Sequence, residues 1–185
     1  MKNYHKKDFP VADIRMFLEP GPIVLVSSHY KGETNIMTMG WHTVLEFSPS
    51  LIGCMITAAN HSFNLIKHSG ECVINIPERH MATTVVDIGN CSGADVDKFE
   101  KFKLTKEAAT EVKAPLIAEC HTSLECKIHD AVLIDKYNFF IFEVVKAHAA
   151  VAPKYPETVH YRGEGHFMVS GEAMSLRERF TPGML

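Results

Sequence analysis

The sequence predicts a mainly β protein, an antiparallel barrel that carries short helices. Short runs of β-branched and apolar residues recur between Gly, Pro and Ser turn signals, as expected for strands. Helical periodicity is confined to a few short segments, and the order of elements lacks the βαβ rhythm of a parallel sheet. The 185 residues suffice for one domain with its own core, so we expect a single domain over residues 1–185.

The first predicted strands form a hairpin. Residues 22–28 are apolar and β-branched after a Gly-Pro turn, and Lys31-Gly32-Glu33 predicts a turn into an extended stretch over 35–47. Residues 48–50 (Ser-Pro-Ser) interrupt this stretch, and the apolar residues 51–57 predict the next strand. These segments predict antiparallel neighbours in the sheet.

Two helices and a further strand are predicted in the middle of the chain. The apolar spacing in residues 61–69 predicts an amphipathic helix that ends at Gly70. Residues 72–76 predict a short strand, 78–88 a second helix and 94–102 a short helical turn.

The second half reads as β-rich. Residues 118–128 alternate, with Cys120, Thr122, Leu124, Cys126 and Ile128 on one face, and further extended segments are predicted at 131–134 and 137–151. Residues 159–185 contain several glycines and are predicted to be irregular. A small barrel fills its own interior with side chains, so a large ligand is expected outside it or at a subunit interface.

Composition excludes several classes of protein. Nineteen basic residues against twenty-two acidic ones give a net charge of −3, which does not predict binding to nucleic acid. No apolar run approaches the ~18 residues that span a bilayer, and no apolar segment of a signal peptide follows the basic start, so we expect no membrane partner and a cytoplasmic location. The five cysteines are odd in number and irregularly spaced, which predicts free thiols. The eleven histidines form no HExxH motif, and we expect no metal site.

Common catalytic motifs are missing from the sequence. It contains no Walker A motif, no GxGxxG and no GxSxG elbow. No pair of carboxylates suggests acid–base work, and no catalytic residue is predicted.

Residues 34–41 are the first segment with a chemical signature. Asn35 and Thr38 lie three residues apart, and Gly40 precedes Trp41, the only tryptophan. An extended backbone here could offer N–H and C=O groups to a flat heterocycle, with Gly40 permitting close approach. The alternative is a hairpin strand whose Met37 and Met39 fill the core.

Residues 57–64 place small and polar residues between a strand and a helix. Asn60 or Ser62 could cap that helix, and the N–H groups of its first turn form an anion site. His61 and Lys67 add positive charge nearby. An ordinary helix cap without a ligand is the alternative.

Two further segments could approach a ligand. In residues 91–99, Lys98 could reach a phosphate or be solvated, and Cys91 lacks an adjacent base that would make it a nucleophile. Asp95 and Asp97 could cap or begin a helix. Residues 160–167 combine aromatic, basic and glycine residues, as in a loop that closes over a ligand or packs on the surface.

Taken together, these segments resemble the flavin reductase-like family, which has the FMN-binding split-barrel fold, and within it flavoredoxin and related NAD(P)H:flavin oxidoreductases. The resemblance covers roughly residues 20–172. It depends on the following pieces: Pro22-Ile-Val-Leu-Val26, Thr34-Asn-Ile-Met-Thr-Met-Gly-Trp41, Ser48-Pro-Ser-Leu-Ile-Gly53, Cys72-Val-Ile-Asn-Ile-Pro77, Cys91-Ser-Gly-Ala-Asp-Val-Asp-Lys-Phe99 and His160-Tyr-Arg-Gly163 with Phe167.

The resemblance implies a homodimer with one FMN per subunit near the interface, and NADH or NADPH as electron donor. It places these residues at the cofactor: Asn35, Met37, Thr38, Met39, Gly40, Trp41, Thr57, Ala58, Ala59, Asn60, Ser62, Cys91, Ser92, Lys98 and Phe167. Ser62 is expected to donate its hydroxyl to the phosphate. The family often has an arginine or lysine beside this helix start, whereas this chain has Asn60-His61-Ser62.

The implied function is an FMN-binding oxidoreductase that passes electrons from NAD(P)H to flavin or another acceptor. Two alternatives remain open, a flavoredoxin-type electron carrier between proteins and a non-redox module that binds flavin or haem. The sequence does not discriminate donor or acceptor.

Overall fold

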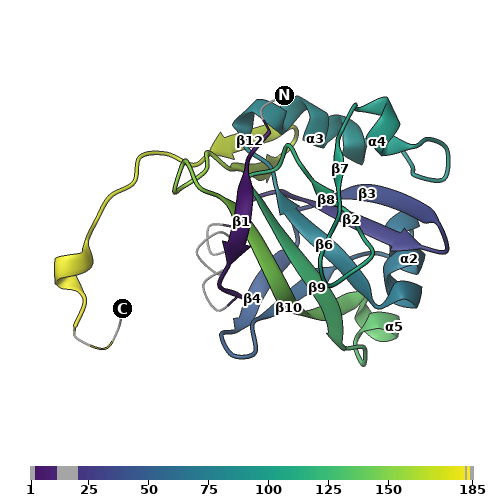
Figure 1. Ribbon diagram of the computed structural model, residues 1–185, viewed down its shortest axis with the longest axis horizontal. Coiled ribbons are helices and arrows are strands. Elements are labelled where there is room, and N and C mark those ends of the chain that lie inside the picture. Colours follow the sequence, from purple (N-terminus) through teal and green to yellow (C-terminus); the bar gives the residue numbers. More distant parts are fainter. Residues whose placement is uncertain (1–2, 12–20, 182, 184–185) are drawn as a thin grey trace.

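The computed structural model describes residues 3–11, 21–181 and 183, and it is built on one antiparallel sheet (Figure 1). Its strands follow the order β3-β2-β6-β9-β10-β5-β4, and β1 pairs with β10. The strands of this sheet are β1 (Lys6–Phe9), β2 (Val24–Tyr30), β3 (Glu33–Met39), β4 (His42–Glu46), β5 (Leu51–Met55), β6 (Glu71–Ile76), β9 (Thr122–Asp130) and β10 (Phe139–Ala150). The predicted mainly β class is confirmed.

Side chains fill the inside of the curved sheet. Phe140 and Phe142 are fully buried there with ring centroids 5.6 Å apart, and Phe63 meets Phe140 edge-on at 5.4 Å. Aliphatic, methionine and cysteine side chains from the other strands complete this cluster. A bulky ligand is therefore expected outside the barrel, as the sequence predicts.

Short helices cover the ends and one side of the sheet (Figure 1). They are α2 (His61–Ser69), η2 (Arg79–Met81), α3 (Ala82–Gly89), α4 (Lys98–Lys101) and α5 (Ile134–Tyr137). The helical turn η3 (Arg177–Arg179) lies instead on the C-terminal segment, away from the sheet (Figure 1). The helix predicted at 61–69 is confirmed with the same bounds, and Gly70 ends it in the left-handed conformation with φ 76°. A second apolar cluster lies between α3 and the sheet.

The prediction that residues 159–185 are irregular was wrong for the first part of this segment. β11 (Val159–Gly163) and β12 (His166–Val169) form a hairpin. The glycines taken as a sign of irregularity make its turn, since Gly163 and Gly165 have φ values of 95° and 77°. Beyond β12 the chain leaves the body of the molecule (Figure 1). A second small hairpin, β7 (Lys106–Glu107) with β8 (Leu116–Ile117), was not predicted.

Two other predicted elements have different bounds in the structure. The stretch predicted over 35–47 is two strands, β3 and β4, and the chain breaks between them at Gly40 and Trp41. Gly40 packs closely at this break, since a Cβ there would lie 2.8 Å from Ile23 Cδ1. The helical turn predicted at 94–102 begins only at Lys98, because the side chain of Asp97 accepts hydrogen bonds from the first free backbone N–H groups and sets the start.

The strands predicted at 118–128 and 131–134 also differ from the structure. Strand β9 starts at Thr122, and Cys120 packs in the cluster under α3 instead of sharing the face of Leu124 and Cys126. The extended segment predicted at 131–134 is a turn that leads into the single helical turn α5.

Candidate functional site

Strand β3 borders the site because it lies at one edge of the sheet. In the described part of the chain β3 pairs only with β2, so its other edge offers backbone N–H and C=O groups to a ligand. Two adjoining cavities follow this edge, and they share Met37 and Asn60. We call the two together the edge groove.

The polar end of the edge groove is a cavity of about 260 Å³ between β3, the start of α2 and the loop before α4. Predicted site residues from three separate segments line it. They are Asn35, Met37, Ala59, Asn60, Ser62, Cys91, Ser92 and Lys98.

Asn35 organises this polar end. It is 2% exposed, and its Nδ2 donates to the Ser62 hydroxyl over 2.9 Å. Its Oδ1 has no hydrogen-bond partner among the residues that the structure describes. Gly93 fits against this amide only because it lacks a side chain, since a Cβ there would lie 2.1 Å from Oδ1. An unpartnered buried acceptor beside a cavity fits a ligand that supplies a hydroxyl or N–H group.

Ser62 is less accessible than its predicted role requires. The residue is fully buried, and its hydroxyl also accepts from Ser28 Oγ at 3.3 Å. Ser62 therefore ties α2 to β2 and β3, and donation to a phosphate stays a prediction.

The start of α2 remains open to a ligand. Asn60 occupies the N-cap position, but its side chain makes no capping hydrogen bond. His61 next to it pairs with Glu33 on β3. The N-terminal end of a helix favours an anion, and no acidic residue lies in the first turn of α2.

Lys98 brings a cation to the same cavity. Its Nζ donates to the backbone oxygen of Ile88 over 2.9 Å, which anchors the start of α4 to the end of α3. Burial lowers the pKa of Lys98 below its usual range, although the nearby Cys91 acts in the opposite direction. An anionic ligand would favour the charged form of this amine.

The apolar end of the edge groove is a cavity of about 250 Å³ between β3 and the end of β5. It is lined by Met37, Thr38, Met39, Gly40, Trp41, Met55, Thr57 and Asn60. Met37 and Met39 are also largely buried in the barrel core, so the core interpretation of this strand is confirmed for them, and their contact with a ligand stays a prediction. Trp41 is 70% exposed and projects beside the groove.

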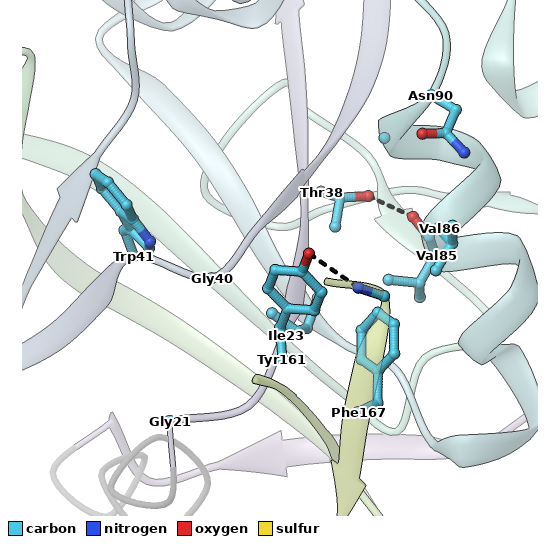
Figure 2. A pocket seen from close by; sticks show the side chains of 12 residues that line it. Gly21, Ile23, Thr38, Gly40, Trp41, Val85, Val86, Asn90, Tyr161 and Phe167 are labelled. Carbon is cyan, nitrogen blue, oxygen red and sulfur yellow. Dashed lines mark hydrogen bonds between the residues drawn. The ribbon is translucent and has the colours of Figure 1, made fainter. Parts of the chain in front are cut away.

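A third cavity of about 470 Å³ adjoins the groove between α3 and the hairpin of β11 and β12; we call it the hairpin cavity (Figure 2). It shares Thr38, Gly40 and Trp41 with the apolar end of the groove. It shares Gly89 and Asn90 with the polar end.

The structure thus brings almost all of the predicted site residues to one connected surface. Phe167 lines the hairpin cavity with Thr38, whereas Ala58 lines none of the three cavities. Sequence reasoning missed Gly89 and Asn90, although they directly precede the segment that starts at Cys91.

Tyr161 was also missed, although it lies in the predicted aromatic segment 160–167. The signal that could have found it is its spacing from Phe167, since the two residues face each other across the hairpin. A predicted hairpin over residues 160–167 would have paired Tyr161 with Phe167.

The described residues show neither a metal-binding cluster nor a membrane-spanning helix. Residues 3–11, 21–181 and 183 contain no group of three His, Cys, Asp or Glu side chains that could hold a metal ion. In the same ranges no helix is long and apolar enough to cross a bilayer.

Comparison with known proteins agrees with this geometry. Residues 16–168 match the family described as "Flavin reductase like domain". An uncharacterized protein of Archaeoglobus fulgidus is 33% identical over 135 residues, which are 73% of this chain and 76% of that protein.

Two solved structures share the fold. An FMN-binding domain of a flavin reductases-like enzyme from Shewanella baltica OS155 superposes with a TM-score of 0.86 at 25% identity, covering 95% of this chain and 99% of that one. Flavoredoxin of Desulfovibrio vulgaris (Miyazaki F) superposes with a TM-score of 0.76 at 22% identity, covering 84% and 89%. The chain has the architecture of FMN-binding split barrels.

Proposed function

This chain belongs to the flavin reductase-like family, and on that premise we propose that it is an FMN-binding oxidoreductase that passes electrons from NAD(P)H to flavin or another acceptor. The observation that carries the proposal is the edge groove, with an apolar end for a flat ring and a polar end for a ribityl phosphate. The unpartnered Oδ1 of Asn35 lies at the polar end and suits a ribityl hydroxyl.

In this proposal the polar end holds the phosphate. Lys98 and the open N-terminus of α2 supply positive charge and N–H groups, and Asn60 at the N-cap lies beside them. Ser92 contributes a hydroxyl from the loop before α4. These groups replace the arginine or lysine that the family often has at the helix start.

The free edge of β3 orients the flavin ring. Backbone groups from Met37 to Gly40 would meet the polar edge of the ring, and the lack of a side chain at Gly40 permits close approach. Bound FMN would supply the electron-transfer chemistry, so the chain itself needs only to bind and orient. This explains why no acid–base pair is required.

The cofactor is tested on the purified protein. We expect a flavin absorption spectrum, and release of FMN on denaturation identified by chromatography. Rapid bleaching of the bound flavin by NADH or NADPH supports the reductase. A protein that binds no flavin contradicts the proposal.

A flavoredoxin-type carrier is the second candidate. One observation favours it, since no Lys, Arg or His is among the described residues that line the hairpin cavity, where the phosphates of a nicotinamide dinucleotide would otherwise find a partner. Bleaching only by a reduced donor protein would support the carrier. Absence of redox turnover with every donor would leave the third candidate, a non-redox flavin- or haem-binding module.

We also propose a homodimer, which the exposed apolar side chains support. The aromatic residues of β10 give no such support, because Phe140 and Phe142 are fully buried inside the barrel. Exposed apolar side chains instead lie at Trp41, beside the groove, and at Phe47, just after β4. Sedimentation that shows a flavin-loaded monomer at micromolar concentration would contradict the dimer.

A further inference from the structure

The hairpin cavity differs from the edge groove in charge. Among the described residues, no Lys, Arg, His, Asp or Glu lines it. Its walls are Ile23 and Val85, which are largely buried, the half-exposed Val86 and the aromatic pair Tyr161 and Phe167 (Figure 2). Burying a charged group against such a surface costs several kcal/mol or more, so the cavity favours a neutral molecule.

The shape of the cavity suits a flat ring. Tyr161 and Phe167 pair across the hairpin, and their ring centroids lie 5.1 Å apart with planes tilted by 51°. They face the aliphatic side chains of α3 across the cavity (Figure 2). Aromatic faces opposite branched aliphatic side chains form a slot for a planar ring.

Two polar groups at separate positions on the rim can bind carbonyl oxygens. The Tyr161 hydroxyl accepts a hydrogen bond from the Gly165 N–H over 3.3 Å, which leaves its own hydrogen for an acceptor. Asn90 caps α3 through its backbone N–H, so its side-chain amide can donate to a ligand. Figure 2 shows these two residues on different sides of Thr38. Thr38 itself is engaged, because its hydroxyl donates to the Val85 oxygen at 2.6 Å.

We propose that the hairpin cavity binds a neutral planar ring with carbonyl groups on two edges, a compound of the quinone class, as the electron acceptor. The inference rests on the proposed function, because the cavity adjoins the groove assigned to FMN through Thr38, Gly40 and Trp41. The bound ring would lie beside the flavin and away from Lys98 and the start of α2, which line the polar end but not the hairpin cavity. Reduced FMN would pass two electrons and two protons to the quinone, which would leave oxidised FMN and a hydroquinone.

Binding is measured by calorimetry on the FMN-loaded and the FMN-free protein, with two matched probes. 1,4-Naphthoquinone is neutral, and 1,4-naphthoquinone-2-sulfonate carries one negative charge on the same ring system. We expect the neutral probe to bind at least tenfold more tightly to both forms. Equal affinity for the two probes would overturn the proposal.

Two variants locate the binding site. Val86→Lys adds a cation on the rim and should raise the affinity for the sulfonate about two- to fivefold. Val132→Lys is the control, because Val132 is exposed and lies outside the cavity. Tyr161→Phe should lower the affinity for naphthoquinone about two- to tenfold, whereas Tyr155→Phe, a tyrosine that is 54% exposed like Tyr161, should not. Unchanged affinities in Val86→Lys and Tyr161→Phe would place the probe elsewhere.

Two outcomes separate this inference from the proposed function. If FMN competes with naphthoquinone, the cavity belongs to the flavin itself. This outcome would refute the acceptor site but not the proposed binding of FMN. If nicotinamide binds more tightly than naphthoquinone, the assignment of the hairpin cavity to a quinone is refuted. A protein that binds naphthoquinone but no flavin would refute the proposed function and, with it, the role of the ring as acceptor.

Discussion

Two buried asparagines on neighbouring parts of the sheet differ in how their side chains are used. Asn75, in the interior strand β6, donates to three acceptors and accepts from the Ile117 N–H at 3.0 Å and the Ser123 hydroxyl at 2.8 Å. Asn35, on the edge strand β3, leaves its Oδ1 without a partner in the described part of the chain. A buried amide whose bonds are all made stabilises the fold, whereas an open one next to a cavity is available for a ligand.

The largest effect on stability is expected at Asn75, the asparagine whose hydrogen bonds are all made. Asn75→Leu should lower the free energy of unfolding by about 2–5 kcal/mol, because the buried Ile117 N–H and Ser123 hydroxyl would lose their acceptor. Urea unfolding of the flavin-free protein, followed by far-UV circular dichroism, measures it. A loss below about 1 kcal/mol would remove the distinction between the two residues.

Glu125 extends the comparison to a buried carboxylate whose oxygens are fully used. Burial disfavours its charge, but N–H groups of Thr110 and Glu111 and the ring of His148 outweigh burial and hold its pKa below the ordinary value of 4.5. The unfolded chain therefore binds this proton at a higher pH than the folded one. The stabilisation is present above about pH 4.5 and is lost as the pH falls below that value.

Urea midpoints measured between pH 7 and pH 3 test this dependence. Glu125→Gln should be less stable at pH 7 and should lose less stability on acidification than the parent protein. An equal acid response in both proteins would assign the effect to other carboxylates.

The open polar end is tested by Asn60→Asp. The change keeps the shape and suits a helix N-cap, so stability should hold, but the added charge lies beside the proposed phosphate site. A charged hydrogen bond of about 1.5–3 kcal/mol corresponds to a ~10- to 150-fold loss of FMN affinity. Riboflavin, which lacks the phosphate, should be affected much less.

Asn64→Asp is the matched control for this prediction. Asn64 lies one turn further along α2, is exposed and does not line the groove. If both flavins weaken equally in Asn60→Asp, the residue supports the fold, and the phosphate would lie nearer Lys98 than the start of α2 within the polar end.

A smaller effect is expected from Asn35→Leu. The variant loses the bond to Ser62 but also removes a buried oxygen that has no partner, so stability should change by less than about 1 kcal/mol. FMN affinity should fall about two- to tenfold. A stability loss as large as that of Asn75→Leu would show that Asn35 is structural.

The smallest effect is expected from Cys91→Ser. Cys91 lines the polar end, and its thiol makes only a long contact of 3.8 Å to the Ile88 oxygen. The other cysteines are buried free thiols, and burial raises the pKa of Cys120 to about 12. Electron transfer at full FMN occupancy should be unchanged, and its loss would assign a redox role to the thiol.

The sequence by itself determined the local elements and the segments of the site. Apolar, β-branched runs between turn signals predict most of the strands, because such residues favour buried extended backbone. The apolar spacing with Gly70 predicts α2 with its observed bounds, because it follows from which face of the helix is buried. Residue types singled out the segments around Asn35, Asn60 and Lys98, and the resemblance to the family assigned them to a cofactor.

Only the tertiary structure decided how those segments combine. Periodicity cannot reveal that β3 is an edge strand, that Gly93 packs on Asn35 or that the hairpin of β11 and β12 faces α3, since each depends on contacts between distant parts of the chain. For the same reason it could not distinguish Asn75 from Asn35. Whether a buried amide finds all of its partners is set by what the fold places beside it.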